Sequence, residues 1–382
     1  MNLAPSDTDR ELAAAVRTWA RSLGDRITVG ERAMSLPLDV VKELGDLGVL
    51  GMTIPERDGG LGASAVAFAL VLEELAAAWP SLAVGVAVNS GIVAGSIVRY
   101  GTDAQRERWL PLLMDGNGLG AFALTEPTSG SDAASLKATA VRDGDGWRIT
   151  GRKQFITSAR YAPIFIVLAR VGQAEASRPH AGITAFIVPK DAPGLSIGPG
   201  EEKMGLRASD TSAVALEEAR VGADAVLGEV GKGFGIAMAG LDGGRIGIAA
   251  QSIGIGRAVL ERAIAYGRER QQFGRSILTF DAVRSALAEA QMQLDAARLL
   301  AHRAARLRDC GQPFTKEASM AKLYASEAAQ RITYSALQVF GGYGYMSEYG
   351  VERYARDVRA TTLYEGTSEI QRTVIARAVM AA

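Results

Sequence analysis

The spacing of apolar residues changes twice along this 382-residue chain, near Gly118 and near Gly231, and these changes limit what the chain can fold into. Before Gly118, apolar residues recur at steps of three and four, which predicts helices. Between the two points, short apolar runs alternate with polar turns, and Asp143-Gly144-Asp145-Gly146 predicts a β-hairpin. Helical spacing then returns in two long alanine-rich stripes, which predict an antiparallel bundle. We therefore expect a mainly α protein with a central β domain: an N-terminal helical domain (1–119), a central β domain (120–228) and a C-terminal helical bundle (229–382).

Charge and hydropathy narrow the range of partners. The 42 basic and 42 acidic residues balance without a basic block, so we expect no nucleic-acid partner. Leu75 to Val98 carries one charge-free run long enough to raise the question of a membrane span. Its Pro80, its Asn89 and its glycines favour a close-packed, buried helix pair, and we expect no membrane association.

Cysteine and histidine are too sparse for several kinds of active site. Cys310 is the single cysteine, and His180 and His302 lie far apart, so we expect no metal site, thiol–histidine pair or serine triad. His302 belongs to an Ala- and Arg-rich helical pattern, and we expect it at the surface or at an interface. The first ten residues lack the order of a signal peptide, which fits a cytoplasmic protein.

Glu365 is the candidate catalyst, because it lies between an aromatic residue and a glycine where a loop changes to a helix. Gly366 allows the backbone to approach a ligand, and Thr367 and Ser368 are residue types that cap a helix predicted from about Glu369 to Ala381. The unpaired N–H groups of such a helix start suit an anionic or carbonyl group. The alternative from this stretch alone is a solvated Glu in a capping turn.

Four other segments combine chemistry with turns, and each has a simpler structural interpretation. Thr125–Asp132 is dense in hydroxyls and suits a heterocycle and a pyrophosphate, or is a plain β-turn. Arg268–Gly274 and Gln338–Tyr345 end long helices with cations, glycines and aromatics, as solvated helix ends also do. Asp242 and Arg245 are one helical turn apart and suit a local ion pair. No phosphate-binding glycine loop or Rossmann unit occurs, so a dinucleotide would bind by another route.

Taken in this order, these segments resemble the acyl-CoA dehydrogenase family of flavoenzymes, most closely its short-chain, butyryl-CoA-type branch. The likeness runs over nearly the whole chain. It implies three domains with a β-barrel-like middle domain and a C-terminal four-helix bundle. It also implies a homotetramer, a dimer of dimers, with FAD extended between the β domain and the bundle. The segments that carry it are Ala123–Asp132, Lys153–Thr157, Met204–Thr211, Leu241–Ala250, Glu269–Gly274, Gln338–Tyr345 and Leu363–Arg372.

The resemblance also implies roles for individual residues. Contacts to the flavin, the ribityl chain or the pyrophosphate would come from Phe122, Leu124, Thr125, Gly130, Ser131, Phe155, Ile156 and Thr157. Contacts across a subunit boundary would come from Arg270, Gln272, Phe273, Gln338, Val339, Phe340, Gly341 and Gly342. Thr367 and Glu369 would close over the phosphates or the adenosine part of FAD. The acyl-CoA would be held by Ser131, Asp242, Arg245 and Gly366.

The implied reaction is α,β-dehydrogenation of a short or short branched acyl-CoA to the trans-2-enoyl-CoA. Glu365 would remove the α-proton, the β-hydrogen would leave as hydride to flavin N5, and electrons would pass to an electron-transferring flavoprotein. Some branches carry the base where this chain has Gly244, so no second base competes with Glu365. Phe155 stands where many members have Trp.

Three alternatives remain open. The same chemistry could act on an acyl-carrier-protein thioester in a biosynthetic pathway. A flavin-binding member without dehydrogenase activity could serve as a binding protein. An oxygen-using oxidase or monooxygenase would differ mainly in how solvent reaches the flavin.

Overall fold

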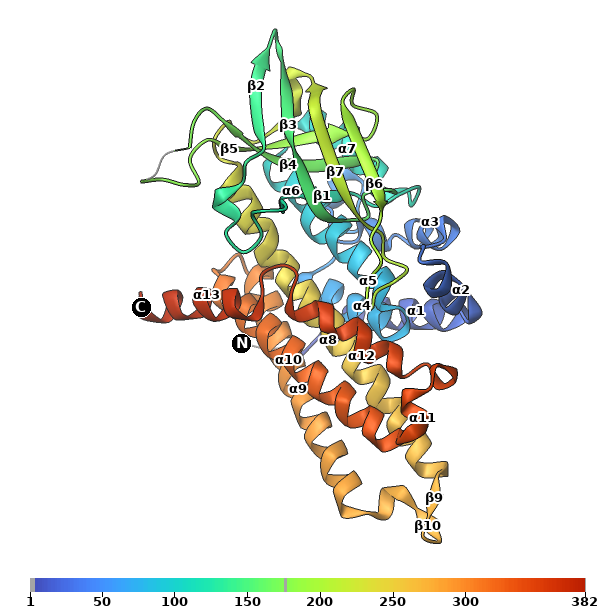
Figure 1. Cartoon of the computed structure of the whole chain (residues 1–382). Helices are drawn as coiled ribbons and strands as arrows, with labels where there is room; N and C mark the ends of the chain where they lie inside the picture. Colours follow the sequence, from blue (N-terminus) through green and yellow to red (C-terminus); the bar gives the residue numbers. More distant parts are fainter. Residues whose placement is uncertain (1–3, 175–176, 382) are drawn as a thin grey trace.

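The computed structural model describes residues 4–174 and 177–381, and it places a β domain at one end of an elongated helical body (Figure 1). The chain begins with helices, as the apolar spacing predicted. Capping residues set their starts: Thr102 accepts a hydrogen bond from the backbone N–H of Gln105 at 3.2 Å and begins α7. The helices of this part are α1 (Asp7–Ser22), α2 (Asp25–Ala33), α3 (Leu38–Asp46), η1 (Val49–Gly51), η2 (Glu56–Asp58), α4 (Ala65–Ala78), α5 (Pro80–Val86), η3 (Ala87–Ala94), α6 (Gly95–Tyr100) and α7 (Asp103–Met114).

The charge-free stretch forms the end of α4 and one continuous helix through α5, η3 and α6. That helix, Pro80–Tyr100, is long and apolar enough to cross a membrane by composition, but 89% of its most apolar window is buried inside the protein. Two of its fully buried polar side chains have partners: Asn89 donates to the Leu113 carbonyl at 3.0 Å, and Ser90 donates to that of Leu50 at 2.8 Å. The helix is therefore a core helix, and it packs beside α4 as predicted.

The β domain is one mixed sheet with the strand order β6-β7-β3-β2-β4-β5-β8, and β1 pairs with β4 beyond the end of β2. β1 and β2 run parallel to β4, and the other neighbours are antiparallel. Asp143 pairs with Gly146 around a two-residue turn in which Gly144 has φ +62°, which confirms the predicted hairpin. The strands are β1 (Ala121–Ala123), β2 (Thr139–Asp143), β3 (Gly146–Thr157), β4 (Ile164–Val171), β5 (Ile183–Pro189), β6 (Leu195–Gly200), β7 (Thr211–Val221) and β8 (Val226–Leu227), with short turns η4 (Ala133–Ser135) and η5 (Ala223–Ala225).

Long helices α8, α9 and α10 form the C-terminal bundle, and their small residues let the axes approach closely. The predicted alanine stripes are buried, for example Ala297 and Ala301 on α9 and Ala321 and Ala325 on α10. His302 is only 6% exposed within one chain, so the expectation of a position at the surface or at an interface was wrong. The elements are α8 (Gly233–Glu269), β9 (Gln271–Gln272), β10 (Arg275–Ser276), η6 (Ile277–Thr279), α9 (Asp281–Asp309), α10 (Thr315–Phe340), α11 (Gly342–Tyr345), η7 (Ser347–Tyr349), α12 (Glu352–Val358), η8 (Arg359–Thr362) and α13 (Ser368–Met380).

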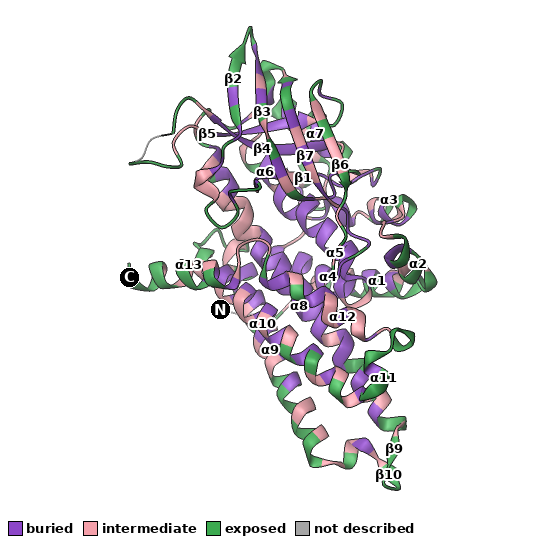
Figure 2. Ribbon diagram, in the orientation of Figure 1, coloured by how far each residue is buried: buried purple, intermediate pink, exposed green. Residues whose placement is uncertain are grey.

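A buried ion-pair network joins the N-terminal helices to the bundle, where Figure 2 shows the largest block of buried residues. Glu73 and Glu74 of α4 are 5% and 6% exposed. Arg298 of α9 lies 2.8 Å from Glu73, and Arg257 of α8 lies 2.7 Å from Glu74. Burial alone would raise the pKa of Glu74, but hydrogen bonds and charge from Arg17 and Arg257 outweigh it and lower that pKa. The first and last helical parts therefore share one packed core.

Candidate active site

The loop between η8 and α13 presents Glu365 in a constrained backbone conformation. Glu365 has φ +52° and Gly366 has φ +93°, so two successive residues are left-handed and the chain turns sharply. A left-handed glutamate costs roughly 1–2 kcal/mol, which surrounding contacts must offset. The Thr367 hydroxyl then accepts from the Ile370 N–H at 3.4 Å and starts α13 at Ser368, one residue before the predicted start.

Side chains from three helices hold the backbone of this loop. Lys322 of α10 is fully buried, and its Nζ donates to the Gly366 carbonyl at 2.7 Å. Gln371 of α13 donates to the carbonyls of Glu365 and Gly366 at 3.0 and 2.9 Å. Arg245 of α8 donates to the Glu365 carbonyl at 3.5 Å. The position of Glu365 is thus fixed by one contact nearby in sequence, from Gln371, and by two that are distant, from Lys322 and Arg245.

The carboxyl group of Glu365 is buried and has no hydrogen-bond partner among residues 4–174 and 177–381. Burial raises its pKa to about 7, although the charges of Lys322 and Arg245 partly offset the effect. Burial likewise lowers the pKa of Lys322 to about 8. The alternative of a solvated capping Glu is therefore wrong, because both carboxyl oxygens of Glu365 are buried away from solvent.

Gly244 of α8 makes room for that carboxyl group. A Cβ atom on Gly244 would lie 2.1 Å from Glu365 Oε2, so a side chain there would displace the carboxyl group. An apolar wall lies beside it, formed by Tyr364 packed against Val84, Leu206 and Ile248. The Tyr364 hydroxyl donates to Gln251 Oε1 at 2.6 Å, so it does not donate to the carboxyl group of Glu365.

Asp242 and Arg245 form the expected ion pair along α8, with Arg245 2.7 Å from Asp242. Arg245 is 4% exposed, and the Thr315 hydroxyl donates to the other Asp242 oxygen at 2.5 Å. Arg245 therefore links Asp242 to the loop that carries Glu365, which spacing alone did not indicate.

Residues predicted to contact FAD from the β domain come together where β1 and β3 end. Phe122 lies in β1, and Phe155, Ile156 and Thr157 end β3. The Gln154 N–H donates to the Thr125 carbonyl at 2.9 Å, which ties the loop after β1 to the end of β3. Leu124 and Ile156 are buried at 8% and 2% exposure, so their contribution to a ligand is limited to the backbone.

A buried ion pair that the sequence analysis did not single out anchors this loop. Lys153 Nζ lies 2.8 Å from Glu126 Oε1 and donates to the Leu124 carbonyl at 3.1 Å. Glu126 also accepts from the N–H groups of Lys137 and Ala138 at 2.6 and 2.9 Å. Desolvation lowers the pKa of Lys153 to about 8 although Glu126 opposes that shift. Both residues hold the loop from inside, while Gly130 and Ser131 stay exposed on it.

These β-domain residues fit a flavin nucleotide. Phe155 is 64% exposed and has φ +58°, within an irregular stretch of the β3–β7 pairing that turns its ring outward. Thr125 and Ser131 add hydroxyls in the anchored loop. A flat apolar ring next to a loop of hydroxyl and N–H groups suits an isoalloxazine with its phosphates.

The residues predicted to act across a subunit boundary gather at the opposite end of the bundle, near α11 and the β9–β10 turn (Figure 1). Six of them line one hollow of about 450 Å³: Arg270, Gln272, Val339, Phe340, Gly341 and Gly342. The Arg270 guanidinium lies 5.3 Å above the Tyr343 ring, and Phe273 is 92% exposed. Gln338 is also exposed on the last turn of α10. Within one subunit, the residues around this hollow therefore lie far from Glu365 and from the β-domain residues predicted to contact FAD.

Glu369, with its predicted role at the phosphates or the adenosine part of FAD, lines a second hollow of about 500 Å³ together with Arg359, Thr362 and Ser368. Thr367 caps the adjoining helix. Metal chemistry has no candidate site in the described parts of the chain, where no group of three or more His, Cys, Asp or Glu could hold an ion.

A small β domain between two helical parts holds a buried carboxyl group whose pKa burial raises to about 7, and such a group suits acid–base chemistry. The chain belongs to the acyl-CoA dehydrogenase family. It matches the N-terminal domain of acyl-CoA dehydrogenase over residues 6–117, the middle domain over 121–219 and the C-terminal domain over 231–380. The protein is therefore an acyl-CoA dehydrogenase, an oxidoreductase.

Relatives place it near the short-chain members. It is 44% identical over 340 residues to the mitochondrial short-chain specific acyl-CoA dehydrogenase of Bos taurus, covering 89% of this chain and 82% of that one. Butyryl-CoA dehydrogenase from Megasphaera elsdenii has 38% identity and a TM-score of 0.96, with both chains covered completely. A chain from a study of the electron transferring flavoprotein of Acidaminococcus fermentans has 37% identity and a TM-score of 0.96, again over both chains.

Two other solved structures bear on cofactor and substrate. Glutaryl-CoA dehydrogenase from Mycobacterium smegmatis in complex with FADH2 has 32% identity and a TM-score of 0.92, covering 99% of this chain and 96% of that one. FAD is the cofactor of this family. The prolyl acyl carrier protein oxidase AnaB has 33% identity and a TM-score of 0.93, covering 98% of this chain and all of that one.

Proposed function

We propose that this protein dehydrogenates a short or short branched acyl-CoA to its trans-2-enoyl-CoA, with Glu365 as the base. The observation that carries the assignment of Glu365 is its buried, unpartnered carboxyl group beside Gly244. The short-chain preference is supported by the 44% identity to a short-chain specific enzyme.

The local environment suits removal of a weakly acidic α-proton. A base works best when its pKa lies near the working pH, and burial raises that of Glu365 to about 7. The charges of Lys322 and Arg245 favour the ionised carboxylate, and Tyr364 next to it packs on the apolar cluster of Val84, Leu206 and Ile248. The proton taken from the substrate ends on a carboxylate oxygen of Glu365. The carbonyl of a thioester must be polarised as this happens, and the backbone N–H of Glu365 is the donor that the family resemblance assigns.

FAD, when bound, supplies N5 as acceptor of the β-hydrogen. Thr125, Ser131 and Thr157 would hold its polar parts, and Phe155 would pack against the ring in place of the Trp of other members. Arg270 and the hollow around Gly341 would act on the FAD of a second copy, because they lie at the far end of the subunit. This arrangement supports a homotetramer built as a dimer of dimers.

Electron-transferring flavoprotein is the proposed acceptor, supported by the similar chain from the Acidaminococcus fermentans study. A second candidate function is the same reaction on a carrier-protein thioester. The similarity to the prolyl acyl carrier protein oxidase AnaB supports this candidate.

Anaerobic bleaching of the oxidised flavin tests this function. The purified FAD-loaded protein is mixed with acyl-CoAs from propionyl to octanoyl, including isobutyryl and 2-methylbutyryl, and with acylated carrier protein. We expect bleaching by the short acyl-CoAs. Glu365→Gln should keep FAD and lose bleaching, because Gln preserves the shape without accepting the proton. Exposed Glu107→Gln is the matched control.

Near-normal bleaching in Glu365→Gln would remove Glu365 from the assignment. Bleaching by carrier protein alone would select the second candidate. A yellow protein that no thioester reduces would point to the non-dehydrogenase member, and hydrogen peroxide formed stoichiometrically in air would point to an oxidase.

A further inference from the structure

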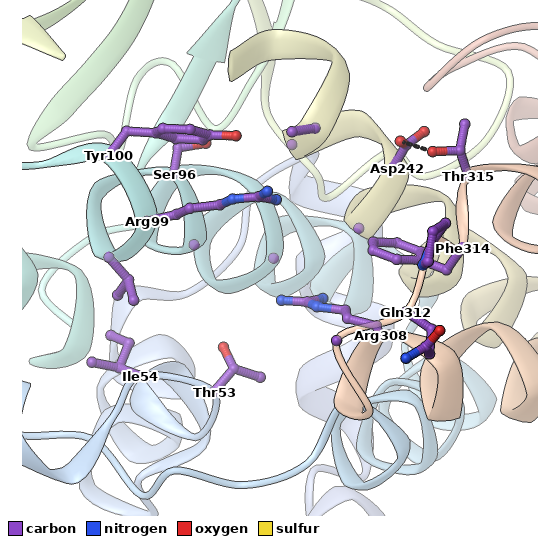
Figure 3. Close-up of a pocket in the computed structure, with 18 residues that line it drawn as sticks. Thr53, Ile54, Ser96, Arg99, Tyr100, Asp242, Arg308, Gln312, Phe314 and Thr315 are labelled. Atoms are coloured by element: carbon purple, nitrogen blue, oxygen red, sulfur yellow. Dashed lines mark hydrogen bonds between the residues drawn. The ribbon is translucent and has the colours of Figure 1, made fainter. Parts of the chain in front are cut away.

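A cavity of about 600 Å³ lies beside the first turns of α8, between α6 and the connection from α9 to α10 (Figure 3). Asp242 and Gly243 line it, whereas the next residue, Gly244, faces Glu365. Successive residues of a helix point about 100° apart, so the cavity and the catalytic loop occupy neighbouring faces of α8.

Two arginines point into this cavity from opposite walls, Arg99 on α6 and Arg308 near the end of α9 (Figure 3). Within the described chain neither guanidinium group makes an ion pair or a hydrogen bond, and that of Arg99 lies 5.2 Å from the ring of its neighbour Tyr100. Burial lowers the pKa of Arg308, and the charge of Arg99 lowers it further against the opposing charge of Asp309. Two like charges that face one cavity repel each other until an anion enters.

The acidic groups nearby are engaged elsewhere. Asp242 accepts from Arg245 at 2.7 Å and from Thr315 at 2.5 Å. Asp309 caps α4 by accepting from the Ala65 N–H at 2.7 Å. Neither carboxylate forms an ion pair with Arg99 or Arg308, although Asp309 acts on Arg308, and Asp242 on Arg99, through charge at longer range.

Ser96 adds a neutral donor that also lacks a partner. It lines the same cavity and is 3% exposed, and its buried Oγ makes no hydrogen bond to any residue that the structure describes. Buried hydroxyls are normally satisfied, so an unpaired one facing a cavity is a donor that a ligand can use. Guanidinium pairs with an added hydroxyl suit phosphate oxygens, which accept several bonds and carry up to two charges.

We propose that Arg99 and Arg308 bind a phosphoanion of the group that carries the acyl thioester, with Ser96 as a further donor. This inference rests on the proposed function, since it takes the thioester to lie at Glu365 and its carrier to extend around α8. Coenzyme A and the phosphopantetheine of a carrier protein share this chemistry, because both end a pantetheine arm in a phosphate ester.

Calorimetric binding of CoA to the FAD-loaded protein tests the proposal without turnover. Arg99→Met and Arg308→Met should each weaken CoA binding about tenfold to hundredfold, the value of one charged hydrogen bond. Exposed Arg306→Met, on the same helix as Arg308 but outside the cavity, is the matched control and should bind like the wild type. An unchanged Kd in both cavity variants would overturn the proposal.

The wild-type protein gives a second test that does not depend on the variants folding. It should bind CoA at least tenfold more tightly than pantetheine, with an advantage that shrinks as salt rises. Equal binding of CoA and pantetheine would overturn the proposal. If phosphopantetheine binds as tightly as CoA, the arginines bind the phosphate at the end of the pantetheine arm. Binding of acylated carrier protein then shows whether a carrier protein can supply that phosphate. If 3′-dephospho-CoA binds weakly, the arginines bind the 3′-phosphate, which only CoA supplies.

Failure of this inference and failure of the proposed function give different results. A protein that binds CoA through Arg99 and Arg308 but is not reduced by any thioester refutes dehydrogenation alone. A protein reduced by butyryl-CoA whose arginine variants bind CoA normally refutes the phosphoanion site alone.

Discussion

Replacing Lys322 by Met should move the pH dependence of proton removal upward. In the wild type the Glu365 pKa is about 7, so half of the carboxyl groups are ionised at neutral pH. The charge of Lys322 lowers this pKa more than the charge of Arg245 does. Loss of an opposite charge close to a buried carboxylate raises its pKa by roughly 1–2 units, which leaves about a tenth to a hundredth of the groups ionised. Flavin reduction near neutral pH should therefore slow roughly fivefold to fiftyfold and recover at higher pH.

Single-turnover anaerobic flavin reduction by butyryl-CoA, followed from about pH 5.5 to about pH 9.5, measures the midpoint. The sign follows from the base role: activity rises as Glu365 loses its proton, and in the variant that step lies at higher pH. Lys322→Arg keeps the charge and should keep the wild-type midpoint. Gln371→Met also removes contacts to the Glu365 and Gly366 carbonyls but carries no charge, so it should lower the rate at every pH without moving the midpoint. A wild-type midpoint in Lys322→Met would refute the electrostatic reasoning.

Four further substitutions test other parts of the structure. Gly244→Ala should abolish flavin reduction while the Tm stays within a few degrees, because its Cβ would meet the Glu365 carboxylate at 2.1 Å; normal reduction would contradict the packing. Lys153→Met leaves Glu126 buried without its cation and should lower the free energy of unfolding by about 3–5 kcal/mol in urea titrations, and an unchanged midpoint would count against the anchor. Asp357→Asn tests a carboxyl group whose pKa is raised from 3.8 to about 7, first by burial and then by the charge of Glu31. Between these two pH values the folded state keeps the proton of Asp357 and the unfolded chain has released it. This group therefore makes the Tm fall as the pH rises from 3.8 to about 7. The Asn variant should flatten that slope, and an identical slope would assign it to other groups. Arg270→Ala should weaken FAD retention on gel filtration, and full retention would argue against a cofactor contact from the far end of the bundle.

Local patterns were enough to predict the order of helical and β parts and the loop-to-helix position of Glu365. Four- and three-residue steps placed the buried alanines of α9 and α10, and the capping residues after Gly366 placed the start of α13 within one residue. Strand β6 was not predicted, because its Gly198, Pro199 and Gly200 interrupt the pattern of a strand. His302 was misplaced, because an Ala- and Arg-rich helix does not show which of its faces meets a neighbour.

The chemistry of the site depends on contacts that no local pattern contains. Glu365 is buried because α8 brings Gly244 against it, and its backbone is held by Lys322 from another helix. A lysine in an alanine-rich helix and another in a strand both suggest solvent-facing positions, yet Lys322 and Lys153 are fully buried. Their roles follow only once tertiary packing has removed water and supplied a partner.

The ion pairs of Glu73 and Glu74 mean that the three family domains are not interchangeable modules. A recombinant that took its first domain from another member would leave Arg257 and Arg298 facing whatever side chains replaced Glu73 and Glu74. Leaving a buried charge without its partner costs about 3–5 kcal/mol, a large share of the stability of most proteins. Chimeras of this protein should therefore be built by exchanging α1 and α4 together with the facing residues of α8 and α9, and a crossover near residue 119 without them should yield an insoluble chain.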